Sequence, residues 1–146
     1  MNLIIRKMKQ TDLESLQRLL SDPVVMRYLE PPYTPEQTAG FLNRCGLSNP
    51  PLVYAVEADG QFIGYVIYHD YDESSMEIGW VLFPQYWGKG YASRLTDQLM
   101  NRARKEGKDI IIECDPDQAA TKCIARSRGF VYEGTDNGLD IFRFSL

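Results

Sequence analysis

Small residues gather in the segment Trp87-Gly-Lys-Gly-Tyr-Ala92, which separates an apolar run from a helical pattern. Gly88, Gly90 and Ala92 remove side-chain bulk where that helix would begin. The N-terminus of a helix has backbone N–H groups without intrahelical acceptors and carries partial positive charge, so this segment could bind phosphate oxygens. The alternative is a tight turn that needs glycine only for its backbone dihedral angles.

The spacing of the glycines disfavours two common nucleotide-binding motifs. A dinucleotide-binding GxGxxG segment requires a third glycine, and none follows Gly90 at that spacing. The GxxxxGK[ST] pattern of nucleotide-hydrolysing P-loops does not match either. We therefore expect a phosphate site of another kind.

Periodic apolar residues and turn residues predict the elements that would position this segment. Strands are expected at residues 3–8, 52–57, 61–69, 76–83, 109–114, 130–133 and 139–144. Capping boxes at Thr11–Glu14 and Thr34–Gln37 would open two helices, which end before Asp22-Pro23 and near Cys45. Two further helices are expected at residues 93–106 and 119–128. Asp59-Gly60 and Asn137-Gly138 predict hairpin turns.

This order of elements predicts an α/β fold with a mostly antiparallel sheet. The strand–helix–strand crossover from Met76 to Cys114 should make one parallel pair, because parallel neighbours need a long connection. No linker, repeat or low-complexity segment interrupts the chain, so we expect a single domain over residues 1–146.

Composition excludes several classes of function. The chain has 146 residues, a net charge of −4 and 25% charged residues, so a nucleic-acid partner is not expected. The N-terminus resembles no signal peptide, and no apolar run could span a bilayer, so no membrane partner is expected. Three cysteines without a CxxC pair predict neither a disulfide framework nor a metal site. Cys114 and Cys123 are expected to be small core residues of a cytoplasmic protein.

The segment Glu77–Ala92 resembles the central motif of the GNAT N-acetyltransferases. The family signature is Arg or Gln, two residues, Gly, one residue, then Gly or Ala, and it falls on Trp87–Ala92 with Trp87 in the Arg/Gln position. This version is most similar to the branch that acetylates ribosomal-protein N-termini, where the tryptophan is familiar. The resemblance continues at Gln118, Thr121 and Gly129-Phe130.

The resemblance implies acetyl-CoA as cosubstrate and no metal. The pantetheine would lie beside Trp80, Val81 and Leu82, where the two parallel strands splay apart. Val81 or Leu82 would donate its N–H to the thioester carbonyl, and Gly79 would suit a bulge that opens the gap. The remaining cofactor-binding residues would be Gly88, Lys89, Gly90, Tyr91, Ala92, Ser93 and Gln118.

Two carboxylates are candidate general bases for an acceptor amine. Glu113 matches a base of the ribosomal branch, and burial among isoleucines would raise its pKa; a solvent-facing carboxylate is the alternative. Glu77 is the second candidate, and a structural ion pair is its alternative. His69 is expected to have a surface or substrate-contact role.

Other positions bear on the leaving group and the acceptor. Many relatives place a tyrosine, as general acid, where this chain has Ala125, so Tyr132, water or an unassisted thiolate would replace it. Arg126 and Arg128 could bind the 3′-phosphate of the cofactor. The alternative is that both are solvated residues on a helix face. Six tyrosines could hold the amine by cation–π contact, or each could simply pack in the core. They are Tyr28, Tyr33, Tyr54, Tyr65, Tyr68 and Tyr71.

The sequence thus favours an N-acetyltransferase that transfers acetyl directly to a primary amine. The acceptor could be a peptide N-terminus, polyamine, antibiotic or metabolite, and the chain a monomer or homodimer. One alternative is a weak or inactive acyl-CoA-binding module of the same fold. Another is an unrelated phosphate-binding α/β domain.

Overall fold

The computed structural model describes residues 2–146. Its helices are α1 (Leu13–Leu20), α2 (Pro35–Phe41), α3 (Tyr91–Lys105) and α4 (Ala119–Ser127). Single helical turns occupy Gln10–Asp12, Leu42–Gly46 and Pro84–Tyr86. The strands are β1 (Leu3–Arg6), β2 (Val53–Ala58), β3 (Gln61–Asp70), β4 (Ser75–Leu82), β5 (Asp109–Cys114), β6 (Val131–Asp136) and β7 (Leu139–Phe144).

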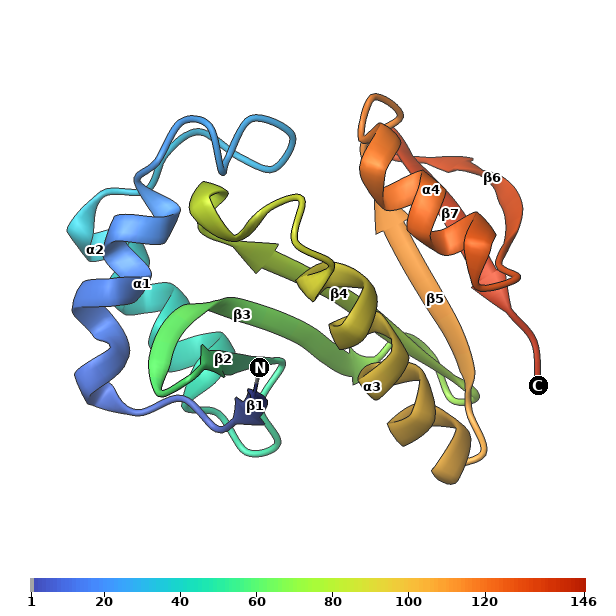
Figure 1. Ribbon diagram of the computed structural model, residues 1–146, viewed down its shortest axis with the longest axis horizontal. Coiled ribbons are helices and arrows are strands. Elements are labelled where there is room, and N and C mark those ends of the chain that lie inside the picture. Colours follow the sequence, from blue (N-terminus) through green and yellow to red (C-terminus); the bar gives the residue numbers. More distant parts are fainter. Residues whose placement is uncertain (1) are drawn as a thin grey trace.

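The seven strands form one mixed sheet in the order β1-β2-β3-β4-β5-β7-β6. Each neighbouring pair is antiparallel except β4 and β5, as the crossover predicted. Helices α3 and α4 lie against one face of the sheet, and α1 and α2 lie at the β1–β3 side (Figure 1).

Alternating side chains of the strands build two cores, one on each face of the sheet. Val66, Ile78 and Leu82 pack with Leu95 and Leu99 of α3 on one face. On the other face, the buried leucines of α1 pack with side chains of β2, β3 and β4: Leu16, Leu19, Leu20, Ala55, Tyr65 and Val81. Cys114 is buried as expected, whereas Cys123 is exposed, so its assignment to the core was wrong.

The two helix starts that the sequence predicted have different outcomes. At α2 the Thr34 hydroxyl accepts the Gln37 N–H at 3.2 Å, and the Gln37 side chain accepts the Thr34 N–H at 2.8 Å, which confirms the capping box. The Thr11–Glu14 box is wrong. Asp12 instead accepts the Lys9 N–H at 2.7 Å and forms an ion pair with Arg6 at 2.8 Å.

The parallel pair of strands is joined over only part of its length. Pairing of β4 with β5 runs from Ser75–Asp109 to Glu77–Ile111 and then stops. Figure 1 shows the two strands separating toward their C-terminal ends. Gly79 pairs with Ile67 in an uninterrupted β3–β4 ladder, so the bulge expected at Gly79 is absent from that ladder.

A glycine of β3 allows close approach to the end of β4. Gly64 has φ of +151°, and an added Cβ would overlap the Val81 carbonyl oxygen and lie 2.8 Å from Leu82 Cα. We expect Gly64→Ala to lower the free energy of unfolding by about 3 kcal/mol, because a backbone oxygen cannot rotate away as a side chain can. Urea denaturation measures this loss.

Gly60→Ala is the matched control for backbone strain. Gly60 also has positive φ, +82°, but an added Cβ would meet nothing within 4 Å. We expect it to cost only the strain of a left-handed alanine, about 1 kcal/mol. Equal losses in the two variants would contradict a clash at Gly64.

Two further properties of residues 2–146 bear on the expectations above. No helix in this range is long and apolar enough to cross a membrane. Within the same residues, no group of three or more His, Cys, Asp or Glu side chains is placed to hold a metal ion.

Candidate active site

The turn between β4 and α3 carries two glycines in left-handed conformation. Gly88 has φ of +71° and Gly90, the residue before α3, has φ of +83°. An added Cβ at either position would meet nothing within 4 Å. The glycines therefore satisfy the dihedral requirement and also leave space open in front of the first turn of α3. A phosphate group fits such an opening.

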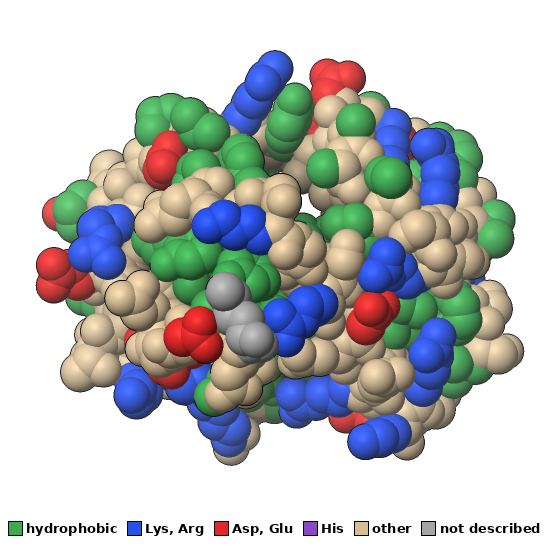
Figure 2. Space-filling model, viewed as in Figure 1, with side chains coloured by type: hydrophobic (Ala, Val, Ile, Leu, Met, Phe, Trp, Pro, Cys, Tyr) green, Lys and Arg blue, Asp and Glu red, His purple; other side chains and the backbone are tan. Residues whose placement is uncertain are grey.

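Basic side chains are numerous on the face of the molecule that carries α3. Figure 2 shows more Lys and Arg than Asp and Glu side chains on the face that carries α3 and α4. Arg128, at the end of α4, forms an ion pair with Asp97 of α3 at 3.0 Å and donates to the Ser93 carbonyl oxygen at 3.5 Å. Arg128 therefore joins the two helices instead of lying on a solvated helix face. The Arg126 guanidinium lies 5.8 Å from the centre of the Phe142 ring.

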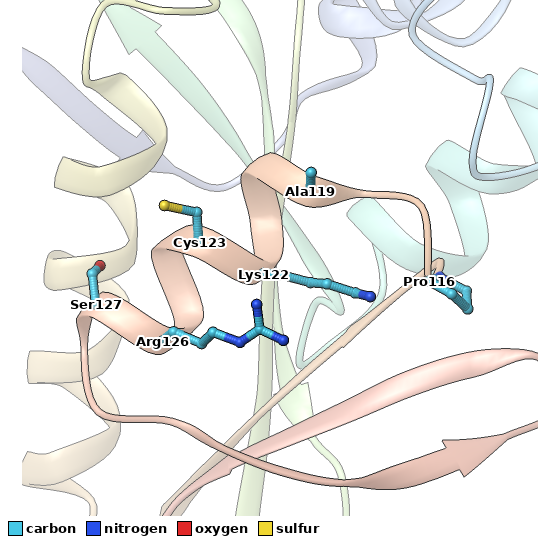
Figure 3. Close-up of a pocket in the computed structure, with 6 residues that line it drawn as sticks. All are labelled: Pro116, Ala119, Lys122, Cys123, Arg126 and Ser127. Atoms are coloured by element: carbon cyan, nitrogen blue, oxygen red, sulfur yellow. The ribbon is translucent and has the colours of Figure 1, made fainter.

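A hollow of about 550 Å³ extends along α4 beside these residues. Figure 3 shows Cys123 and Ser127 projecting from one side of α4, and Lys122 and Arg126 from the other. Lys122 forms an ion pair with Asp140 at 2.9 Å. The Gln118 side-chain oxygen accepts the Asp115 N–H at 2.8 Å, so this predicted cofactor residue holds the turn that precedes α4.

The direction of the backbone groups at the end of β4 follows from one hydrogen bond. Phe83, the residue after β4, donates its N–H to the carbonyl oxygen of Ile63 in β3 at 3.0 Å. Since successive residues of a strand point their backbone groups to opposite sides, the N–H of Val81 also faces β3, and those of Trp80 and Leu82 face β5. Between the two predicted donors, the geometry favours Leu82.

The two predicted bases lie on the same face of the sheet, opposite α3 and α4. Glu77 pairs with Ile111, so Glu113, two residues further along β5, projects to the same side. Glu77 lies at the last paired position and Glu113 lies beyond it, where the strands have separated. His69 lies beside them, with its Nε2 atom 3.7 Å from Glu77 Oε1.

The pKa shifts show that these groups interact. Burial raises the pKa of Glu77; His69 opposes the rise, and the Glu113 carboxylate adds to it. Partial burial raises the pKa of Tyr71, with further rises from Glu113, Glu77 and Asp136. Tyr71 therefore lies beside Glu113, and Asp136 adds a weaker negative charge to their surroundings. The sequence had placed Tyr71 among aromatic candidates, but nothing in its local pattern indicated Asp136.

Replacement of Glu77 by glutamine should change stability in a pH-dependent way. A carboxyl group whose pKa is raised in the folded state lowers stability once pH exceeds its unfolded pKa, because the unfolded chain ionises more readily. Glu77→Gln should therefore raise the melting temperature by about 2 to 4 °C at pH 8. The gain should vanish at pH values below the unfolded pKa, near 4. Calorimetry at both pH values tests this, and a gain of equal size at both would contradict it.

The six tyrosines do not form one aromatic group. Arg102 lies over the Tyr54 and Tyr68 rings, at 5.2 and 4.8 Å from their centres, on the α3 face. Tyr65 is buried on the opposite face, and Arg27 lies over Tyr28. Of the six, only Tyr71 lies beside Glu77 and Glu113 in the part of the chain that the structure describes, residues 2–146.

The two positions considered for a general acid, Ala125 and Tyr132, have structural contacts of their own. Ala125 is completely buried in the core beneath α4. The Tyr132 hydroxyl is hydrogen-bonded to Thr135 at 2.8 Å, and Thr135 donates to Asp140 at 2.7 Å. Tyr132 therefore belongs to a network at the β6–β7 end of the sheet.

This seven-stranded mixed sheet, with one separating parallel pair and helices on both faces, is the fold of acetyltransferases of the GNAT class. The chain itself belongs to that family, because the model of the acetyltransferase (GNAT) domain matches residues 2–131. A Bacillus subtilis protein described as the uncharacterized N-acetyltransferase YnaD is 30% identical over 137 residues, covering 90% of this chain and 81% of that protein.

Solved structures agree with this assignment. A GNAT acetyltransferase from Bacillus anthracis has a TM-score of 0.84 and 28% identity, over 98% of this chain and 93% of that one. Spermidine N-acetyltransferase from Vibrio cholerae, solved with CoA and spermine, has a TM-score of 0.79 and 22% identity, over 97% and 92% of the two chains. At lower TM-scores, the fold is shared by a ribosomal-protein-alanine N-acetyltransferase from Brucella melitensis and by a Salmonella typhimurium protein solved with acetyl-CoA.

Proposed function

We propose that this protein, acting as one domain, transfers the acetyl group of acetyl-CoA directly to a primary amine. One observation carries the proposal. An open glycine turn at the start of α3 follows one end of β4, and the half-buried carboxylate of Glu77 lies near the other end of that strand. The two features flank the point where β4 and β5 separate. Solved relatives with CoA or acetyl-CoA support the identity of the donor.

The residues of the turn fit the phosphates of acetyl-CoA. The backbone N–H groups of Gly88, Gly90 and the first turn of α3 would hold the pyrophosphate, and Arg128 lies beside that turn. The chain of the pantetheine would extend along Trp80–Leu82, whose outward backbone groups have no β5 partner beyond Glu77. When bound there, acetyl-CoA supplies a thioester carbonyl that the Leu82 N–H can polarise.

The chemical step requires a neutral amine. A lysine-like amine has a pKa of about 10.4, so deprotonating it at pH 7 costs about 4 to 5 kcal/mol. Glu113 is our proposed base because it lies two residues beyond the last paired position of β5, on the part of that strand that has separated from β4. The amine nitrogen forms a bond to the carbonyl carbon, the carbon–sulfur bond breaks with its electron pair on the CoA thiolate, which leaves and takes a proton from water, and the amine proton passes to the carboxylate.

The charges around Glu113 favour a cationic acceptor. Glu113 and Asp136 form no ion pair with Lys or Arg within residues 2–146, and Glu77 is paired only with His69. A protonated amine near these carboxylates would neutralise their charge, and the Tyr71 ring offers a cation–π contact. We therefore place a polyamine or another multiply charged small amine ahead of a peptide N-terminus. A spermidine acetyltransferase and a ribosomal-protein-alanine acetyltransferase both share this fold, so the order rests on the charges.

The alternative is a weak or inactive acyl-CoA-binding module. The buried Ala125 in place of a tyrosine motivates it, because the CoA thiolate then leaves without that proton donor. The missing tyrosine does not exclude an active enzyme, because water can protonate the CoA thiolate in its place.

Thiol release from acetyl-CoA distinguishes the two functions. The purified protein is mixed with acetyl-CoA and, in separate reactions, spermidine, an aminoglycoside, a peptide with a free N-terminus and the N-acetylated form of that peptide. We expect amine-dependent thiol release, fastest with spermidine. Binding of acetyl-CoA without release on any amine would favour the module, and absence of acetyl-CoA binding would contradict both functions.

A further inference from the structure

The indole of Trp87 turns back onto the end of β4 instead of extending over the glycine turn. Its Nε1–H donates to the Leu82 carbonyl oxygen at 2.9 Å, although 49% of the residue is exposed. An indole has a single N–H donor and no acceptor. Once bonded to Leu82, the Trp87 side chain cannot also donate to a phosphate, whereas Arg and Gln side chains have more than one N–H donor.

This bond holds one peptide group from both sides. The group that joins Leu82 to Phe83 directs its N–H to Ile63, at 3.0 Å, and its carbonyl oxygen to Trp87. Because β5 has no residue paired with β4 beyond Glu77, that carbonyl lacks a strand partner and the indole takes its place. The orientation of Leu82 is therefore fixed by two hydrogen bonds that lie outside the β4–β5 ladder.

The turn between Leu82 and Trp87 is itself compact. Trp87 donates its own N–H to the Pro84 carbonyl oxygen at 3.0 Å, and Tyr86 donates to Phe83 at 2.9 Å. Gly88 follows directly. A shift of the glycine turn would consequently be transmitted through Trp87 to the last residue of β4.

We propose that Trp87 is a positioning residue, which couples the phosphate-binding turn to the Leu82 N–H that faces the separated strands. The proposal rests on the proposed function, since it assigns that N–H to the thioester carbonyl. Trp87 then acts on the acetyl group through Leu82, and it makes no contact with the phosphates through its side chain.

Trp87→Phe removes the donor and keeps an aromatic ring. CoA and acetyl-CoA share their phosphates and pantetheine and differ only in the acetyl group, so titration calorimetry with each ligand separates the two roles. We expect the Kd for CoA to stay within twofold and the Kd for acetyl-CoA to rise about three- to tenfold, the effect of one hydrogen bond. Tyr86→Phe is the matched control. It removes a hydroxyl of the same turn that contacts Gln61, at 3.4 Å, and should change neither value.

Hydrogen exchange of the indole protons tests the bond in the unliganded wild-type protein. The chain has two tryptophans, so two indole N–H signals are expected in a nitrogen-15 spectrum, and Trp87→Phe assigns one of them. The Trp87 signal should exchange at least about tenfold more slowly than free tryptophan, in spite of the exposed ring.

Three results would overturn the proposal. Equal weakening of CoA and acetyl-CoA in Trp87→Phe would place the side chain on the phosphates. Unchanged acetyl-CoA affinity would remove any influence on the acetyl group, and exchange at the rate of free tryptophan would show that the bond does not form in solution. If the wild-type protein binds neither ligand, the proposed function fails, and the exchange measurement still decides whether Trp87 is bonded to Leu82.

Discussion

Gly90→Asp should weaken acetyl-CoA binding at least about a hundredfold. The open space in front of α3 would receive a side chain, and its carboxylate would lie where the pyrophosphate is expected. Two like charges about 4 Å apart repel by about 1 to 4 kcal/mol near a protein surface, and each 1.4 kcal/mol is a factor of ten in affinity. Titration calorimetry with acetyl-CoA measures the loss.

Two comparisons separate this effect from damage to the helix. Gly107→Asp adds the same side chain at the other end of α3, where φ is +71° and nothing lies within 4 Å of an added Cβ. It should affect melting temperature without changing affinity. Gly90→Asn adds nearly the same volume without charge and should bind with intermediate affinity. A Gly90→Asp variant that binds acetyl-CoA as tightly as the wild type would contradict the phosphate site.

Glu113→Gln should lower kcat/KM at pH 7 by about a hundredfold with the best amine of the panel. A positioned base contributes factors of this order, and glutamine cannot accept the proton. The deficit should shrink as pH rises toward the pKa of the amine, because a growing fraction of the acceptor is then neutral without help from the protein. A pH–rate profile from pH 6 to 10 measures both effects.

Glu133→Gln provides the same change of charge on β6, which β7 separates from β5 in the sheet. Glu133 is paired with Arg143 at 3.0 Å, is exposed, and is not among the groups that shift the pKa of Glu77 or Tyr71. Its profile should follow that of the wild type. If Glu113→Gln also leaves the profile unchanged, Glu113 is not the base, and Glu77, whose pKa burial raises, becomes the candidate to test.

Local patterns were sufficient for much of the fold. The Thr34–Gln37 box and the Asp59-Gly60 and Asn137-Gly138 turns each depend on residues within four positions of one another, and all three are present. Strands β5 and β7 have the predicted bounds for the same reason, since apolar runs between turn residues define them. The parallel pair followed from chain connectivity alone.

Features that depend on distant residues could not be read in this way. The start of α1 is set by Arg6, which contacts both Asp12 and Glu57, and Glu57 lies on another strand. The need for glycine at position 64 arises from the close approach of Val81 and Leu82, seventeen or more residues later in the chain. The choice between Val81 and Leu82 required the hydrogen bond of Phe83 with Ile63.

The tyrosines illustrate an inference that the sequence did permit. Tyr65 and Tyr68 are three residues apart on one strand, so period-two alternation places them on opposite faces. Grouping them near one substrate ignored that rule. Only part of the carboxylate group could be predicted, because the charge of Asp136 acts on Tyr71 only through the β5–β7–β6 strand order.

The separated end of β4 and β5 has basic helices on one face and carboxylates on the other. On the proposed function, the donor therefore occupies one side of the sheet while the acceptor approaches from the opposite side, and neither must leave before the other binds. Steady-state kinetics should then be sequential, and CoA should compete with acetyl-CoA but leave the acceptor's access open. The sheet thus separates the donor from the acceptor, and the gap between β4 and β5 is the opening through which only the acetyl group needs to pass.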